Sequence, residues 1–192
     1  VFYIYALSRS SRYSAYLNNG ELKTQIVAMS AGIFGALIIA GINYRFISKL
    51  WFLYGPAALI LSLLLFTPMG IQRAGTDDIG WLNFFGIITF QPSEALKLAF
   101  ILTMATHLNK IGDKLNKLPH LILVCIHGLA PVALVSVQGD DGSAMVFLFI
   151  FIFMVLVAGI SWKYIFAAAV LAPVGLWFVW NFIMQNHHRM RF

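Results

Sequence analysis

Long apolar runs are the feature of this sequence that most restricts the folds open to it. A helix of about 20 apolar residues crosses the ~30 Å hydrocarbon core of a bilayer, and six such runs follow one another along the 192 residues. The runs are 26–42, 50–69, 82–108, 120–137, 144–160 and 164–184, and 1–7 is the end of an earlier one. Because 60% of the residues are hydrophobic and only 10% are charged, a soluble domain of this size could not bury the apolar surface.

The sequence therefore predicts an all-α polytopic membrane protein. We expect a single transmembrane domain over residues 1–192, built as a bundle of about six complete transmembrane helices plus a partial first one. Since the chain starts at Val1 inside an apolar run and stops in "NHHRMRF", we expect it to be a fragment of a longer protein.

Charges between the runs predict how the helices are oriented. Successive loops alternate between two sides of the membrane, and cytoplasmic loops carry an excess of Lys and Arg. The cations of one side are Arg45, Lys49, Lys110, Lys114, Lys117 and Lys163. That side has Asp113 as its one anion, whereas the opposite side mixes four cations with five acidic residues. We place the first side in the cytoplasm, and this topology explains the net charge of +6 better than nucleic acid binding does.

A proline in the third run indicates where its helix begins. The stretch "ITFQPSEALKLAF" places Pro92 directly after Gln91. Proline is favoured at the first position of a helix and disfavours helix in the residue before it. The run 82–108 is therefore broken near residue 91. We expect 82–90 to dip into the membrane or the outer interface, and a helix from Pro92 to descend to the cytoplasm.

Glu94 and Lys97 lie three residues apart in this helix and therefore share one face. A charge inside a bilayer is costly without a partner, so a structural ion pair at the helix entry is one interpretation. The other is the polar floor of a substrate site on the outer face. The loop "QGDDGS" could be a solvated turn, but its shortness also holds Asp140 near the membrane surface on the same side as Glu94.

The histidines and the single cysteine give no pattern for metal binding. His107, His120 and His127 lack the spacing of metal ligands, and Cys125 has no second cysteine to pair with. Buried histidines are more often packed or hydrogen-bonded groups than ligands, and a lone buried cysteine behaves as a small hydrophobic residue. We therefore expect packing roles for them and no metal site.

Four motifs follow one another along the chain: "FQPSEALKLA", "QGDDGSA", "VAGISWKYI" and "MQNHHRMRF". In the same order they resemble the signatures of the SEDS family (shape, elongation, division and sporulation), the group that contains RodA, FtsW and SpoVE. The resemblance implies a ten-helix bundle, of which this chain would supply the end of the first helix through the end of the seventh. One departure is Gly139, which stands where the family usually has proline.

The resemblance also implies a function. Proteins of this family are peptidoglycan glycosyltransferases of cell elongation, division or sporulation. They polymerise lipid II at the outer face of the bacterial cytoplasmic membrane, release undecaprenyl pyrophosphate, contact membrane lipids and work with a class B penicillin-binding protein. The residues that match the family's substrate cavity are Gln91, Glu94, Lys97, Asp140 and Arg191. The resemblance places the family's main catalytic base beyond residue 192, and the reaction it implies is compatible with a divalent cation as cofactor.

Two other functions are compatible with the sequence. A flippase or transporter of the lipid-linked precursor would also need a charged pathway, but such proteins commonly have broken helices in two matching halves. Only one such element is evident, at 91–97, which favours the enzyme. A non-catalytic scaffold for a penicillin-binding protein would need the helices without the chemistry.

Overall fold

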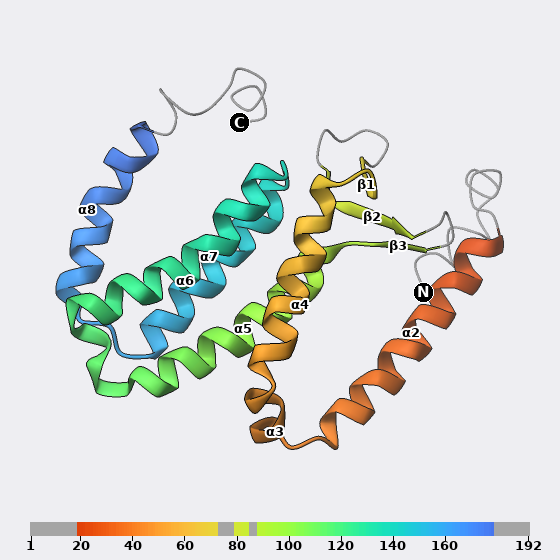
Figure 1. The fold of residues 1–192 in the computed structure, drawn as a ribbon, viewed down its shortest axis with the longest axis horizontal. Coiled ribbons are helices and arrows are strands. Elements are labelled where there is room, and N and C mark those ends of the chain that lie inside the picture. The colour runs from red at the N-terminus through yellow and green to blue at the C-terminus, as the bar shows by residue number, and fades with distance from the viewer. Residues whose placement is uncertain (1–18, 73–78, 85–87, 179–192) are drawn as a thin grey trace. The chain divides into compact units, whose positions relative to one another are not determined.

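The structure is a computed structural model that describes residues 19–72, 79–84 and 88–178 (Figure 1). The chain divides into two compact units, Val1–Lys49 and Leu50–Phe192. The helices of the first unit are α2, Asn19–Ala40, and the short α3, Tyr44–Lys49. The helices of the second unit are α4, Trp51–Leu63; α5, Pro92–Ile111; α6, Leu118–Val137; α7, Asp141–Val157; and α8, Trp162–Phe178. The prediction of a mainly helical fold is confirmed.

The number of membrane spans stays a prediction. Among the described residues, α6 is the one helix that is both long enough and apolar enough to cross a membrane. The shorter apolar helical stretches are Gln25–Ala40, Trp51–Phe66, Asp141–Val157 and Trp162–Leu171. The predicted partial span 1–7 lies outside the described residues, as does the end of the predicted span 164–184.

A small sheet makes the all-α prediction wrong in one region. Its strands are β1, Gly70–Ile71; β2, Trp81–Phe84; and β3, Ile88–Phe90. They pair antiparallel in the order β1-β2-β3, with Leu82 opposite Gly70 on one side and opposite Phe90 on the other. Residues 82–84 and 88–90 lie in strands, and α5 begins after them at Pro92. Strand pairing satisfies backbone groups of these aromatic and β-branched strands, which a lone extended segment would leave open.

Two short helical segments also occupy stretches that the sequence assigned to loops. The helix α3 lies in the predicted loop after the first complete run, and a 3-10 helix, η2, covers Gly112–Asn116 between α5 and α6. A further 3-10 turn, η1, extends α4 over Leu64–Phe66. Short 3-10 segments of this kind are common at the ends of helices.

The helices α4 to α7 pack around one apolar core. Helix α4 packs on α5, and α6 packs on both α5 and α7. Phe147, Met104, Val124 and Val135 are fully buried at these contacts. The ring of Phe147 lies 5.6 Å from that of Phe100, tilted by 57°, a favourable geometry for two aromatic rings. This core fixes α5, α6 and α7 relative to one another, and those helices carry the predicted site.

The side chain of Asn116 joins two neighbouring connections, at the end of α5 that lies away from Pro92. The side chain of Asn116 in η2 accepts a hydrogen bond from the backbone N–H of Ser161 at 2.6 Å and donates one to the carbonyl of Gly159 at 3.2 Å. Its own carbonyl accepts a bond from the hydroxyl of Tyr164 at 2.9 Å. Asn116 therefore holds the turn between α7 and α8 against the connection between α5 and α6.

Helix α6 approaches α7 closely because it has no side chain at Gly128. A Cβ added there would overlap the ring of Phe151 on α7. We expect Gly128→Ala to lower the free energy of unfolding by about 1–3 kcal/mol, the usual cost of overpacking. Thermal unfolding of the purified protein in detergent would measure the change. Gly32→Ala is the matched control, since a Cβ at Gly32 meets nothing within 4 Å; equal losses in both variants would contradict the close-packing account.

Candidate functional site

The candidate site lies at the start of α5, directly after the last strand of the sheet. Strand β3 ends at Phe90, and Gln91 is the N-cap residue with extended backbone angles of φ −98° and ψ 106°. Pro92 is the first helical residue, as the sequence predicts, and Glu94 is therefore the third. The backbone N–H of Glu94 donates to the carbonyl of Gln91 at 3.2 Å. The carboxylate of Glu94 thus lies in the first turn, where the helix dipole favours negative charge.

Lys97 and Glu94 form the ion pair that their spacing predicts. The ammonium of Lys97 lies 2.7 Å from Oε1 of Glu94. The two partners differ in exposure: the side chain of Lys97 is 18% exposed, whereas that of Glu94 is 60% exposed. The lysine is therefore the inner charge and the glutamate the outer one. Because Glu94 is exposed, the ion pair contributes little stability by itself. Its main consequence is that it holds the ammonium of Lys97 in a mostly buried position.

Asp140 joins α5 to α7. One carboxylate oxygen accepts a hydrogen bond from the side-chain amide of Gln91 at 3.2 Å. The other accepts from the backbone N–H of Ser143 at 2.9 Å, which makes Asp140 the N-cap of α7. Because Gln91 also bonds to the backbone of Glu94, it connects the ion pair to Asp140. The structure thus brings Asp140 to the same end of the helices as Glu94, and the side of the membrane on which they lie stays a prediction.

The connection between α6 and α7 is closed by a turn that requires glycine. Gly139 has φ +84°, a left-handed conformation that proline cannot adopt and that glycine adopts freely. The N–H of Gly139 donates to the carbonyl of Ser136, and the N–H of Asp140 donates to that of Val135. These two bonds form a Schellman motif. The departure from the family's usual proline thus coincides with a well-defined helix ending.

A buried glutamine supports the turn from below. Gln138 is 5% exposed, and its side-chain amide donates to both the carbonyl and the hydroxyl of Ser62 at 3.0 Å. The carbonyl of Gln138 accepts a bond from the backbone N–H of Ile79, just before β2. These bonds tie the end of α6 to α4 and to the segment entering the sheet. By anchoring Gln138, they also position Asp140, two residues later, for its hydrogen bond with Gln91.

The remaining predicted site features have different outcomes. Arg191 lies outside the described residues. Within the described ranges, no group of three or more His, Cys, Asp or Glu side chains could hold a metal ion.

Two polar networks were missed by sequence reasoning. One is the contact between Gln138 and Ser62; the other joins His107 on α5 to His127 on α6, whose Nδ1 atoms are 3.0 Å apart. His127 also bonds through Nε2 to the hydroxyl of Thr103 at 3.1 Å. The two histidines are 20 residues apart, which conceals their proximity in the sequence. Their similar depth in consecutive antiparallel helices is the signal that could have revealed it.

These features define a helical bundle with a charged, hydrogen-bonded cluster at one end of its helices. A family model described as the cell cycle proteins FtsW, RodA and SpoVE matches residues 1–192. The chain therefore belongs to that family, as its motifs indicate.

Individual relatives agree with this assignment. The peptidoglycan glycosyltransferase MrdB of Escherichia coli (strain K12) is 28% identical over 173 residues, which are 90% of this chain and 45% of that protein. A probable peptidoglycan glycosyltransferase FtsW of Geobacter sulfurreducens (strain DL-1 / KN400) is 32% identical over 180 residues, which are 88% of this chain and 44% of that protein. The chain thus spans about half the length of the curated relatives it matches.

Solved structures show the same fold. A chain from a study of how a peptidoglycan synthase complex coordinates polymerization and crosslinking matches with a TM-score of 0.75 and 26% identity, over 98% of this chain and 53% of that one. The rod shape determining protein RodA of Thermus thermophilus matches with a TM-score of 0.66 and 27% identity, over 88% of this chain and 56% of that one.

Proposed function

We propose that the full-length protein containing this chain is a peptidoglycan glycosyltransferase. It polymerises lipid II at the outer face of the bacterial cytoplasmic membrane and works with a class B penicillin-binding protein in elongation, division or sporulation. Two relatives named for this activity support the proposal. The observation that carries it is the cluster in which Gln91 links the pair of Lys97 and Glu94 to Asp140.

The proposed reaction makes one glycosidic bond and releases one molecule of undecaprenyl pyrophosphate. A sugar hydroxyl attacks the anomeric carbon of a lipid-linked sugar, a base removes the hydroxyl proton, and undecaprenyl pyrophosphate leaves with the electron pair of the broken bond. A fixed cation in a partly dehydrated site stabilises the charge that develops on the leaving group. We assign that role to Lys97, because it is the inner member of the ion pair.

Asp140 is a poor candidate for the base. Both of its carboxylate oxygens accept hydrogen bonds from Gln91 and Ser143, whereas a general base must reach the substrate proton. We therefore assign Asp140 a positioning role between α5 and α7. The base is a carboxylate in the part of the protein beyond residue 192, and the complete fold is a bundle of ten helices.

Glycan synthesis by the purified full-length protein tests this function. With its penicillin-binding protein partner it should convert lipid II into glycan strands, visible as a ladder on a gel. Gln91→Leu should reduce the rate by about tenfold to a hundredfold, since it removes a hydrogen bond to a charged acceptor worth about 1.5–3 kcal/mol. Lys163→Gln, at the start of α8, is the control and should polymerise like the parent.

Two results would replace this proposal. Passage of lipid II across liposome membranes without glycan formation would establish transport as the function. Equal polymerisation by the parent and Gln91→Leu, with both proteins inserted in the membrane, would remove the cluster from the reaction and favour a scaffold.

A further inference from the structure

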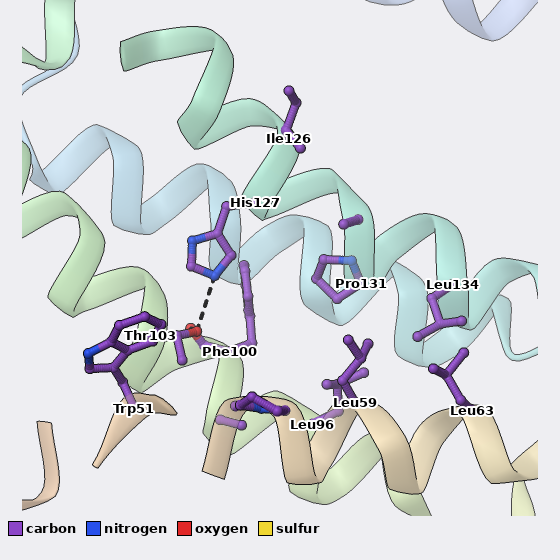
Figure 2. A pocket seen from close by; sticks show the side chains of 14 residues that line it. Trp51, Leu59, Leu63, Leu96, Phe100, Thr103, Ile126, His127, Pro131 and Leu134 are labelled. Atoms are coloured by element: carbon purple, nitrogen blue, oxygen red, sulfur yellow. Dashed lines mark hydrogen bonds between the residues drawn. The ribbon is translucent and has the colours of Figure 1, made fainter. Parts of the chain in front are cut away.

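An elongated apolar cavity lies between α4, α5 and α6, and one end of it reaches Leu96, the residue before Lys97. Its volume is about 550 Å³, within the range of ligand-binding cavities. Along α4 it extends from Trp51 to Leu63, about 18 Å at 1.5 Å per residue. Figure 2 shows Leu59, Leu63 and Leu134 at one part of the wall and Trp51 at the other end. The shape suits a hydrocarbon chain.

Polar groups in the wall are already engaged with one another. Figure 2 shows His127 and Thr103 pointing toward each other, and His127 Nε2 lies 3.1 Å from the threonine hydroxyl. That hydroxyl donates to the carbonyl of Phe100 at 3.1 Å, and the other ring nitrogen of His127 meets His107 at 3.0 Å. One arrangement satisfies all three bonds: His107 donates to His127, which donates to Thr103. The cavity therefore offers an occupant apolar contacts rather than hydrogen bonds.

The Trp51 end of the cavity carries positive charge. The ammonium of Lys110, in the last turn of α5, lies 5.1 Å from the centre of the Trp51 ring. In the described part of the chain no carboxylate forms an ion pair with Lys110, and its side chain is exposed. Lys114 and Lys117 follow at the same end of the bundle. An aromatic ring beside a lysine is typical of the depth at which lipid headgroups lie.

We propose that this cavity binds one acyl chain of an anionic phospholipid, with the lipid phosphate against Lys110. The apolar wall recognises the chain, and the exposed ammonium of Lys110 beside Trp51 recognises the negative headgroup. The proposal rests on the proposed membrane location, and the headgroup belongs to the cytoplasmic leaflet. Lys110 and Glu94 are 16 residues apart on α5, or about 24 Å along the helix, so the lipid headgroup lies at the opposite end of α5 from the proposed polymerisation site. The apolar wall extends from there to Leu96, the residue before Lys97.

Photolabelling of the full-length protein in nanodiscs tests the site. The probe is phosphatidylglycerol with a diazirine in one acyl chain, compared with the same probe in phosphatidylethanolamine. Labelled peptides identified by mass spectrometry should include Ile126 and Leu59 of the cavity wall. Lys110→Gln should reduce labelling by phosphatidylglycerol about fivefold, the weight of one lysine near an anionic headgroup. Lys163→Gln is the control, because Lys163 also lies over an aromatic ring, 4.9 Å from that of Tyr164.

A second pair of variants tests the cavity itself. Ala130→Trp fills it from an exposed position on α6, whereas Ala133→Trp places the same side chain on the same helix outside it. Labelling of the wall should fall in the first variant and persist in the second. Any of three results would overturn the proposal: equal labelling by the two lipids, equal labelling in the two tryptophan variants, or displacement of the probe by lipid II. Because the readout is lipid binding, it is independent of whether the protein polymerises glycan.

Discussion

Replacing Asp140 with alanine should reduce glycan polymerisation by about tenfold to a hundredfold, the cost of a displacement of about 1 Å in a site. Alanine removes the acceptor for the N–H of Ser143 and the acceptor for the amide of Gln91. Loss of an N-cap alone costs about 1–2 kcal/mol of stability. Without either bond, the start of α7 is no longer tied to the start of α5. Initial rates of glycan synthesis and the midpoint of thermal unfolding would both be measured.

Asparagine at the same position separates geometry from charge. Its side-chain oxygen can accept from Ser143, and its amide can donate to Gln91 once the Gln91 amide has turned over. Asn caps helices about as well as Asp, so Asp140→Asn should stay within about threefold of the parental rate. Asp113→Ala, an exposed acid at the other end of the bundle, should match the parent. An Asp140→Asn enzyme as inactive as Asp140→Ala would show that the negative charge, and not the link between helices, is what the reaction needs.

Lys97→Met should reduce the polymerisation rate about a hundredfold. Glu94→Gln should reduce it only about threefold. Methionine keeps most of the apolar length of lysine and removes the cation, and loss of one electrostatic stabiliser of a transition state costs about 10²–10³ in rate. Glu94→Gln leaves the ammonium in place. Since Glu94 is 60% exposed, water can replace much of what the carboxylate contributes. The rates would be measured at saturating and at low lipid II concentrations.

The double variant identifies how the pair works. If Lys97 acts alone on the pyrophosphate, Lys97→Met with Glu94→Gln should be as slow as Lys97→Met by itself. If both single variants are equally slow and equally destabilised, the pair is a structural element at the helix entry, and the assignment of Lys97 to the leaving group is wrong. Lys163→Gln at the start of α8 is the control for loss of a positive charge.

Local rules were enough to predict the first turn of α5. Proline sets the helix start, and a spacing of three residues places Glu94 and Lys97 together. The proximity of Asp140 to this turn followed from the shortness of one loop and from the side of the membrane on which it falls. These inferences need only neighbours in sequence and a topology.

The rest depended on contacts between distant segments. The sequence separates 82–90 from the helix that begins at Pro92, but hydrophobicity alone does not distinguish a short strand from other apolar segments, so the sheet was missed. The hydrogen bond from Gln138 to Ser62 joins residues 76 positions apart. The pattern of apolar residues in the two helices does not predict it. The cavity between α4, α5 and α6 likewise arises from how three helices pack, which the individual apolar runs do not encode.

The short turn at Gly139 also bears on how the protein is made. It ends α6 and leads directly to the N-cap of α7, so residues 118–157 form a helical hairpin whose turn is closed by backbone bonds between residues 135 and 140. Contacts between segments close in sequence form early in folding. We therefore expect this hairpin to form as one unit while the chain is still being synthesised, and to serve as the surface on which α5 and its charged first turn are then assembled.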